Sequence, residues 1–290
     1  MFYLKQYLPT INDTVYYSEL TNFTYFSLLK YINNSDNRGV QQCFDEIVVN
    51  HIKTPTTLSS LDKFLILLDM RSICVGDSIE LKLKTGNAAR LSIFSILENI
   101  KSKVKDINFR KSCVIDDITL NLYIPTNILV DREDDIYESV VESVEFNGIA
   151  SRLDVFTKEQ KEEFFKSLPA TAFNYISQYV IDVREQIKDI NIINSNTLLE
   201  IEEVPFNLFD NTLFMFLKLL YTDDLMNFYE QQYSFIKKLK FTHDHFMKMT
   251  PNESRLFINL YNKDIKTQED AKNKGSGNSP GGPLPAFASL

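Results

Sequence analysis

Two histidines near the C-terminal end, His243 and His245, have a spacing that could serve metal binding. Residues two positions apart face the same side of a β-strand, where both imidazoles could bind one metal ion. The hydrophobic pattern instead places them between two helices, no cysteine lies nearby, and the third histidine, His51, is distant. We therefore expect solvent-exposed loop histidines, with no metal site and no other cofactor.

An acidic cluster is a second candidate, because carboxylate oxygens bind hard cations such as Ca²⁺. It lacks the glycine and the ligand spacing of an EF-hand loop, so a solvated acidic turn is the favoured interpretation. The members of the cluster are Asp131, Glu133, Asp134, Asp135 and Glu138.

A short basic run, Lys237, Lys238 and Lys240, lies between Phe235 and Phe241 and could contact phosphates. At the end of an amphipathic helix, the same lysines more simply complement the partial negative charge of the helix C-terminus. We favour the second interpretation.

Signature motifs of nucleotide-binding and hydrolytic enzymes are missing from the chain. No glycines form a P-loop or a GxGxxG turn, and no GxSxG elbow occurs. Acidic pairs are frequent, but none has a context that singles out a glycosidase dyad. We therefore expect no enzymatic activity and no catalytic residues. The glycines before residue 275 are Gly39, Gly76, Gly86 and Gly148.

The acidic composition points to protein partners. A net charge of −8 and a pI of about 5.1 argue against a nucleic-acid-binding surface, which needs a basic face. Cys43, Cys74 and Cys113 are far apart and form no CxxC pair. Reduced cysteines in a cytoplasm are therefore favoured over disulfides or zinc.

No attachment to a membrane is expected. The first residues lack the basic start and the long apolar run of a signal peptide. The most apolar stretch, Phe206 to Tyr221, is interrupted by Asp210 and Lys218 and is shorter than the ~20 residues of a membrane span. We expect a buried helix there.

The N-terminal part, residues 1–76, predicts a hairpin followed by helices. The hairpin should turn at Asn12-Asp13, and a loop should follow the first helix at 33–39. Helices are expected over 22–33, 40–52 and 60–73. The apolar side of the first helix would carry Phe23, Phe26, Leu29, Tyr31 and Ile32.

The middle part, residues 77–150, predicts a small β-rich subdomain that carries one helix. Apolar and polar residues alternate over 78–84 and 117–124, as expected of half-buried strands, and a third strand is expected over 139–146. Residues 88–104 have helical periodicity instead.

The third part, residues 151–266, predicts helices. Thr157 with Gln160 forms a capping box that starts a helix, and Pro169 should break or kink this helix. Further helices are expected over 173–187, 206–221 and 224–239.

The clearest helix start in the sequence lies further on. Thr250 can act as N-cap, Pro251 takes the first helical position, and Glu253 completes a second capping box. This last helix should run to about residue 266. The whole pattern predicts an α+β fold, with helical N- and C-terminal parts around the β-rich middle.

The last segment, residues 267–290, reads as a disordered tail. Half of the eight glycines and three of the nine prolines lie at its end, a composition typical of flexible linkers. The tail ends in an apolar octapeptide that could order on binding a partner, or have no role. The candidate partner-docking residues are Leu284, Pro285, Phe287 and Leu290.

Three blocks in this order resemble a known family. They are LDKFLILLDMRSICVGD at 61–77, FKSLP at 165–169, and LMNFYE at 225–230 running into MTPNE at 249–253 and Leu260-Tyr261. Together with Leu8-Pro9 and the Tyr-rich segment after it, they resemble the baseplate hub subunits of T-even-type contractile-tailed phages. The resemblance covers most of residues 1–266, and 84–150 fits it less closely.

The resemblance implies a structural component of the tail baseplate hub that acts through protein–protein interfaces in tail assembly. It implies other baseplate and hub proteins as partners, location in the virion tail, and presence in the bacterial host cytoplasm during assembly. The chain could also form a homo-oligomer. The alternative is a transient hub assembly chaperone that is absent from the mature virion.

Overall fold

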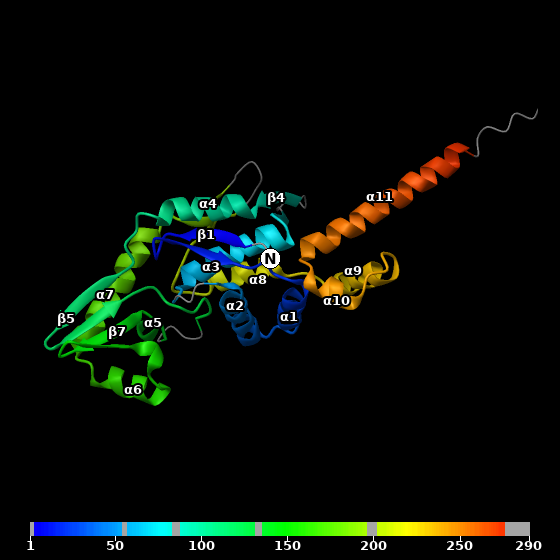
Figure 1. Cartoon of the computed structure of the whole chain (residues 1–290). Helices are drawn as coiled ribbons and strands as arrows, with labels where there is room; N and C mark the ends of the chain where they lie inside the picture. Colours follow the sequence, from blue (N-terminus) through cyan, green and yellow to red (C-terminus); the bar gives the residue numbers. More distant parts are fainter. Residues whose placement is uncertain (1–2, 54–56, 83–87, 131–134, 196–201, 276–290) are drawn as a thin grey trace, which may run out of the picture.

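A computed structural model of the chain describes residues 3–53, 57–82, 88–130, 135–195 and 202–275. Helices predominate, and short antiparallel strands lie between them (Figure 1). The predicted α+β class is confirmed, and the largest sheet lies in the middle of the chain. No helix within these described ranges is long and apolar enough to span a membrane.

The N-terminal part is built around helix α3, in which every residue except Lys63 is buried. Helices α2, α4 and α8 and strand β1 all contact it. The predicted hairpin is confirmed, with Asn12 in a left-handed turn conformation. The elements of this part are β1 (Leu4–Leu8), β2 (Asp13–Tyr17), α1 (Asn22–Asn33), α2 (Asn37–His51), α3 (Ser60–Met70) and the π-helical turn η1 (Arg71–Val75).

The start of α3 is fixed by a buried capping box. Ser59 caps the helix, and the Asp62 carboxylate accepts hydrogen bonds from the Ser59 backbone N–H at 2.9 Å and from its hydroxyl at 2.6 Å. Thr10, from the β1–β2 turn, also donates to Asp62. Burial nevertheless raises the pKa of Asp62. The turn of the hairpin and the first turn of α3 are therefore held together by one carboxyl group.

The end of α3 is tied down in the same way. The Tyr17 hydroxyl of β2 donates to the buried carboxyl group of Asp69. The Tyr221 hydroxyl of α8 (Thr212–Tyr221) donates to the Leu67 carbonyl at 2.7 Å. Burial raises the pKa values of Tyr17 and Asp69. Polar groups that burial removes from water thus find partners on elements far away in the sequence.

The middle part contains a two-stranded sheet, a four-stranded antiparallel sheet in the order β5-β6-β7-β8, and two helices, α4 and α5, where the sequence predicted one. Cys113, Leu120 and Val144 pair across β5, β6 and β7 and are buried, so they define the inner face of the larger sheet. The elements are β3 (Ser78–Lys82), β4 (Ala88–Ser92), α4 (Ile93–Val104), β5 (Lys111–Ile115), β6 (Ile118–Leu122), α5 (Asp135–Ser139), β7 (Val141–Phe146), β8 (Ile149–Arg152) and the 3₁₀ turn η2 (Leu153–Val155).

Two helices follow the sheet and meet at Pro169, as predicted. The capping box of Thr157 and Gln160 is present at the start of the first of them. Pro169 ends it and serves as the N-cap of the second, which contacts β5. The elements are α6 (Lys158–Ser167), α7 (Ala170–Ile187) and the short strands β9 (Asn191–Ile193) and β10 (Val204–Pro205).

The C-terminal helices are anchored to α1. The Asn22 side chain donates to the Phe246 carbonyl at 2.8 Å, and the Asn22 backbone N–H donates to the Met249 carbonyl at 2.7 Å. The predicted capping box is confirmed, with Thr250 and Glu253 bonded reciprocally at 2.8 and 3.2 Å. After α8 come α9 (Leu225–Lys237), α10 (His243–Lys248) and α11 (Pro251–Gly275), and α11 projects away from the rest of the molecule (Figure 1).

The predicted helix over 88–104 is wrong at its start, because Ala88–Ser92 forms strand β4. Leu91 pairs with Ile79 of β3 in this sheet. The Ser92 hydroxyl then accepts the Ser95 backbone N–H at 3.1 Å, so the helix begins only at Ile93. Pairing with a neighbouring strand therefore overrides a helical periodicity that continues across the boundary.

The predicted helix over 206–221 is also too long, because only Thr212–Tyr221 is helical. Asn207 accepts the Phe209 backbone N–H at 3.0 Å, and Asp210 accepts that of Thr212 at 2.7 Å. Such local bonds from Asn and Asp offer the backbone a turn in place of a helix.

The first two helices differ from the prediction in smaller ways. Asp36 accepts the Gly39 backbone N–H at 2.9 Å, so α2 begins at Asn37 and the predicted loop over 33–39 is shorter. Phe23 and Tyr31, expected on the apolar side of α1, are 63% and 40% exposed.

Other element boundaries also differ between the prediction and the structure. Strands β5 and β8 were not predicted from the sequence, and the four-stranded sheet extends to Arg152. Helix α11 continues to Gly275, so residues 267–275 are helical. The remaining domain ranges, 1–76, 77–150 and 151–266, stay predictions.

Replacing Tyr17 with Phe should destabilise the chain by about 2 kcal/mol, because the buried carboxyl group of Asp69 loses its donor. Urea unfolding followed by circular dichroism measures this. Tyr7→Phe is the matched control, because the Tyr7 hydroxyl bonds Asn12 on an exposed part of the same hairpin. It should change stability by less than about 0.5 kcal/mol. Equal effects of the two substitutions would show that the Tyr17–Asp69 bond is unimportant.

The burial of Asp69 also predicts the sign of a pH effect. Burial raises the pKa of Asp69 in the folded chain above its ordinary value of 3.8. At a pH between the ordinary and the raised pKa, the folded state therefore binds more protons than the unfolded state. The unfolding free energy of the wild type, relative to that of Asp69→Asn, should therefore rise as the pH falls from 7 towards 4. Urea titrations of both proteins at several pH values test this, and a difference that shrinks on acidification would contradict it.

Candidate protein-binding surface

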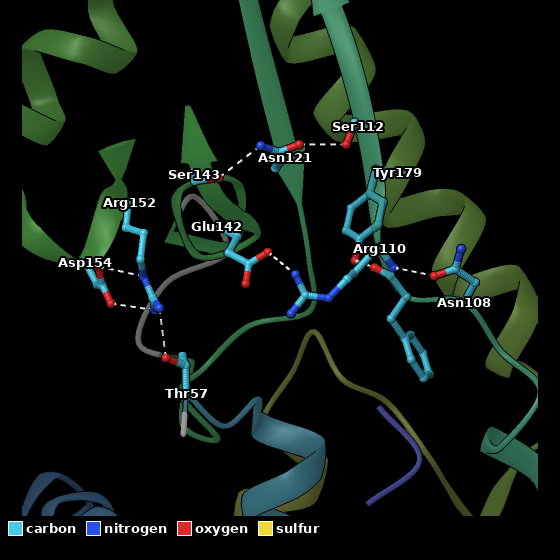
Figure 2. A network of polar contacts seen from close by, with 11 residues as sticks. Thr57, Asn108, Arg110, Ser112, Asn121, Glu142, Ser143, Arg152, Asp154 and Tyr179 are labelled. Carbon is cyan, nitrogen blue, oxygen red and sulfur yellow. Dashed lines mark hydrogen bonds and ion pairs between the residues drawn. The ribbon is translucent and has the colours of Figure 1, made fainter. Parts of the chain in front are cut away.

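The outer face of the four-stranded sheet carries a row of hydrogen-bonded polar side chains (Figure 2). Ser112 donates to Asn121 at 2.6 Å, and Asn121 donates to Ser143 at 3.0 Å. The strand register places these residues and Arg152 directly opposite one another on adjacent strands, so they share a face. The row therefore follows from the alternation of side chains along each strand.

Charged side chains extend this row. Arg110 lies 2.5 Å from Glu142, and its guanidinium group is 4.3 Å from the centre of the Tyr123 ring. Arg152 pairs with Asp154 at 2.7 Å and donates to Thr57 at 3.0 Å (Figure 2). Because Thr57 precedes α3 closely in the chain, Arg152 connects the sheet with the helical N-terminal part.

A third contact secures the same region. The buried Tyr179 hydroxyl of α7 donates to the Phe109 carbonyl just before β5, at 2.7 Å (Figure 2). Two hollows of about 300 Å³ each lie beside this network, and both are lined by Glu142 and Arg152. Arg110 and Arg152 each have a carboxylate partner within the chain. We therefore infer that this network serves to hold the sheet in position.

The cysteines offer no reactive thiol. Cys43, Cys74 and Cys113 are all free and buried. Burial raises the pKa of Cys43 and of Cys74 to about 12. A thiol with so high a pKa is almost entirely protonated near neutral pH and is therefore a poor nucleophile.

The two candidate histidines are exposed, as predicted, but they lie in the short helix α10 and not in a loop. His243 is 2.9 Å from the Gln232 amide, and His245 is 2.6 Å from the Thr242 hydroxyl that caps α10. Across the residues that the structure describes, no three His, Cys, Asp or Glu side chains are placed to hold a metal ion.

The other candidates fall partly outside the described residues. The basic run lies at the C-terminal end of α9, where Lys237 is the last helical residue and Lys238 the C-cap. Asp135 and Glu138 belong to α5. The acidic positions Asp131, Glu133 and Asp134, and the docking candidates Leu284, Pro285, Phe287 and Leu290, lie outside the described residues.

The best-formed candidate for binding another protein lies where α1 and α9 pack together. Phe26 of α1 stacks on the buried Phe228 of α9 with ring centres 4.9 Å apart, and its ring is 5.5 Å from that of Tyr229. The side chain of Asn33 donates to the Asp223 carbonyl just before α9, so the two helices run antiparallel. The ring contacts therefore fix the packing of α1 against α9, from which the outward side chains of both helices project.

Large exposed side chains surround this contact. Phe23 lies one turn before Phe26 on α1, and Met226 and Tyr233 lie one turn to either side of Tyr229 on α9. They are 63%, 60% and 61% exposed, and Tyr229 is 46% exposed. We name these residues the α1/α9 surface: Phe23, Phe26, Met226, Tyr229 and Tyr233.

Sequence reasoning missed this surface. Phe23 was expected on the buried side of its helix, and Met226 and Tyr229 were noticed only as part of a family resemblance. A signal was present, because Met226, Tyr229 and Tyr233 form a second apolar stripe beside the buried one of Phe228 and Phe235. Periodicity alone does not tell which of two stripes faces the core.

Comparisons with known proteins agree with the resemblance in the sequence. A family described as T4 bacteriophage base plate protein matches residues 1–209, from the N-terminal hairpin through α7 to the segment before α8. No curated protein and no solved structure matches the chain. Because the match covers 209 of the 290 residues, the chain belongs to the T4 bacteriophage base plate protein family.

Proposed function

We propose that this protein is a structural component of the phage tail baseplate hub and acts through protein–protein interfaces during tail assembly. Membership of the base plate family supports a structural protein of the virion tail whose partners are other baseplate proteins. The hub assignment rests on the three sequence blocks at 61–77, at 165–169, and at 225–230 running into 249–253 and Leu260-Tyr261. No catalytic role is part of the proposal.

The observation that carries the interface is the α1/α9 surface. Scattered exposed apolar residues are normal, but a group of aromatic and Met side chains on adjacent packed helices is typical of a binding site. Here Phe23, Met226 and Tyr233 are each at least 60% exposed, while Phe26 and Phe228 beneath them are fixed by stacking. Rings that are already held in place, as those of Phe26 and Tyr229 are, lose little freedom on binding, which favours a tight interface.

The remaining features of the chain are also consistent with protein partners. The net charge of −8 disfavours phosphate backbones, so nucleic acid is not among the proposed partners. Association of the chain with itself is compatible with an exposed apolar surface. The docking candidates Leu284, Pro285, Phe287 and Leu290 remain proposed contacts of the tail segment.

The alternative function is a transient hub assembly chaperone that leaves before the virion is complete. It would act during assembly in the bacterial host cytoplasm. The α1/α9 surface favours a permanent part, because large exposed apolar groups on a free subunit are normally covered in the final assembly.

Placing two carboxylates on the α1/α9 surface should block incorporation into tails. In the variant Met226→Glu/Tyr233→Glu, both charges would have to be desolvated in the interface. We expect incorporation to fall at least about ten-fold, the equivalent of ~1.4 kcal/mol. The measurement is the amount of variant chain in tails purified from infections supplied with it alone.

The matched control is Val49→Glu/Val155→Glu, which adds the same charge at exposed apolar positions on α2 and η2. Both proteins should keep the wild-type circular dichroism spectrum and melting temperature, because none of the four positions is buried. Normal incorporation of the α9 variant would contradict the proposed interface.

A further inference from the structure

Two arginines from distant parts of the chain meet where α11 leaves the body of the molecule. Arg71 is the first residue of η1, and Arg255 lies one turn into α11, which contacts η1 (Figure 1). Gly76, directly after η1, lies beside both side chains. A Cβ atom added to Gly76 would be 3.8 Å from Nη1 of Arg71 and 3.8 Å from Nη2 of Arg255. The two guanidinium groups therefore border the same small space.

The conformation of Gly76 keeps this space open. Its φ of 138° is one that residues with a side chain rarely adopt, so the position favours glycine. Apart from its neighbours in the chain and the two arginine nitrogens, no described atom lies within 4 Å of the place where its Cβ would stand. Glycine at this position thus leaves room for a small group beside both arginines.

The N–H groups of the two arginines are only partly used within the chain. Arg71 donates from Nε to the Leu220 carbonyl at 2.6 Å and from Nη1 to the Gly76 carbonyl. Arg255 donates from Nε to the Pro251 carbonyl at 3.3 Å. Its Nη2 is buried and has no hydrogen-bond partner in the part of the chain that the structure describes. Because a guanidinium group carries five N–H donors, both arginines keep donors available for a ligand.

The positive charges of the pair also lack a bonded counter-charge. Across the described residues, neither Arg71 nor Arg255 forms an ion pair with an acidic side chain. Burial lowers the pKa of Arg71, and the positive charge of Arg255 adds to this effect, while Asp223 opposes it. The Asp223 carboxylate accepts the Asp224 backbone N–H at 2.8 Å instead of bonding either arginine. Two cations partly removed from water are costly, and an anion bonded to both would offset this cost.

A carboxylate is the anion that suits this arrangement. The planar fork of a guanidinium group binds a carboxylate through two parallel N–H···O bonds. The nearby negative charge of Asp223 favours a singly charged ligand over a phosphate dianion. A free carboxylate ion gains little from so small a contact, whereas an acidic side chain is held in place by the rest of a protein interface.

The arginine pair adjoins the α1/α9 surface through Tyr25 of α1. The Tyr25 ring centre is 6.4 Å from that of Phe228, which underlies this surface. Burial and the charge of Asp223 raise the pKa of Tyr25, and the positive charges of Arg71 and Arg255 oppose the rise, so both lie near its hydroxyl. A protein that covers the α1/α9 surface can therefore also place an acidic side chain at the arginines.

We propose that Arg71 and Arg255 together bind one carboxylate group of a protein partner. The side chain of an Asp or Glu residue enters the space beside Gly76 and accepts N–H groups from both arginines. Binding of a carboxylate is a property of the isolated chain, while its source in a baseplate protein rests on the proposed function.

Acetate binding to the isolated full-length protein tests the site. NMR resonances of the Nε–H groups in isotope-labelled arginine should shift for Arg71 and Arg255 with one common dissociation constant. Replacing Arg255 with Met should weaken acetate binding at Arg71 at least about ten-fold, because one of the two charge-assisted contacts is lost. The matched control is Arg90→Met, which should keep the wild-type affinity because Arg90 pairs with Glu80 at an exposed position.

Urea unfolding separates ligand binding from a structural role of Arg255. In buffer without carboxylates, Arg255→Met should unfold at the same or a higher urea concentration than the wild type, because it removes a buried donor that has no partner. Acetate should stabilise the wild type more than this variant, compared with sodium chloride of equal ionic strength. Equal acetate affinities of the two proteins, or a variant that is less stable in both buffers, would overturn the proposal.

Tails from infections supplied with one form of the chain test the source of the carboxylate. Incorporation of Arg255→Met should fall at least about ten-fold, and Arg90→Met should be incorporated like the wild type. Normal incorporation of Arg255→Met, together with its loss of acetate binding, would overturn the assignment to a partner. Absence of even the wild-type chain from finished tails would instead contradict the proposed function, while the acetate result would still support the carboxylate site.

Discussion

The structure depends on the burial of α3, because this helix carries two carboxyl groups into the core. Asp62 and Asp69 lie one at each end of the helix, and burial raises the pKa of both carboxyl groups. Buried polar groups are costly unless they are hydrogen-bonded. The hairpin supplies donors to both ends, Thr10 at the first and Tyr17 at the last, while Tyr221 of α8 bonds the main chain between them. Packing of the hairpin and of α8 on α3 is therefore specified by polar contacts as well as by apolar area.

Local signals in the sequence predict the start of several helices correctly. The capping boxes at Thr157 and Thr250 are both present, because they need only residues three positions apart. Strand β4 and the segment around Asn207 were mistaken for helix, since strand pairing and side-chain turns decide their conformation. The α1/α9 surface could not be predicted, because exposure of Phe23 or Tyr233 depends on which helices pack together. Contacts such as Tyr17 with Asp69 join residues too far apart for any local pattern to reveal.

The family and the structure together explain how this chain could take part in a baseplate. The matched residues, 1–209, contain the hairpin, α3 and the polar network that holds the sheet beside Thr57. The helices after the match are anchored to the same body through Asn22 and Tyr221. They carry several exposed large apolar side chains, including Met226 and Tyr233 of α9. The α1/α9 surface thus combines residues of the matched part, on α1, with residues of the C-terminal helical part, on α9.

The central claim is that the chain is a permanent part of the baseplate hub. Quantitative mass spectrometry of purified mature tails, compared with lysate of infected cells, tests it most directly. The account predicts a fixed, integral number of copies per particle, because an interface at the α1/α9 surface keeps the subunit in the finished tail. Presence of the chain in lysate and its absence from finished particles would contradict the account and identify an assembly chaperone.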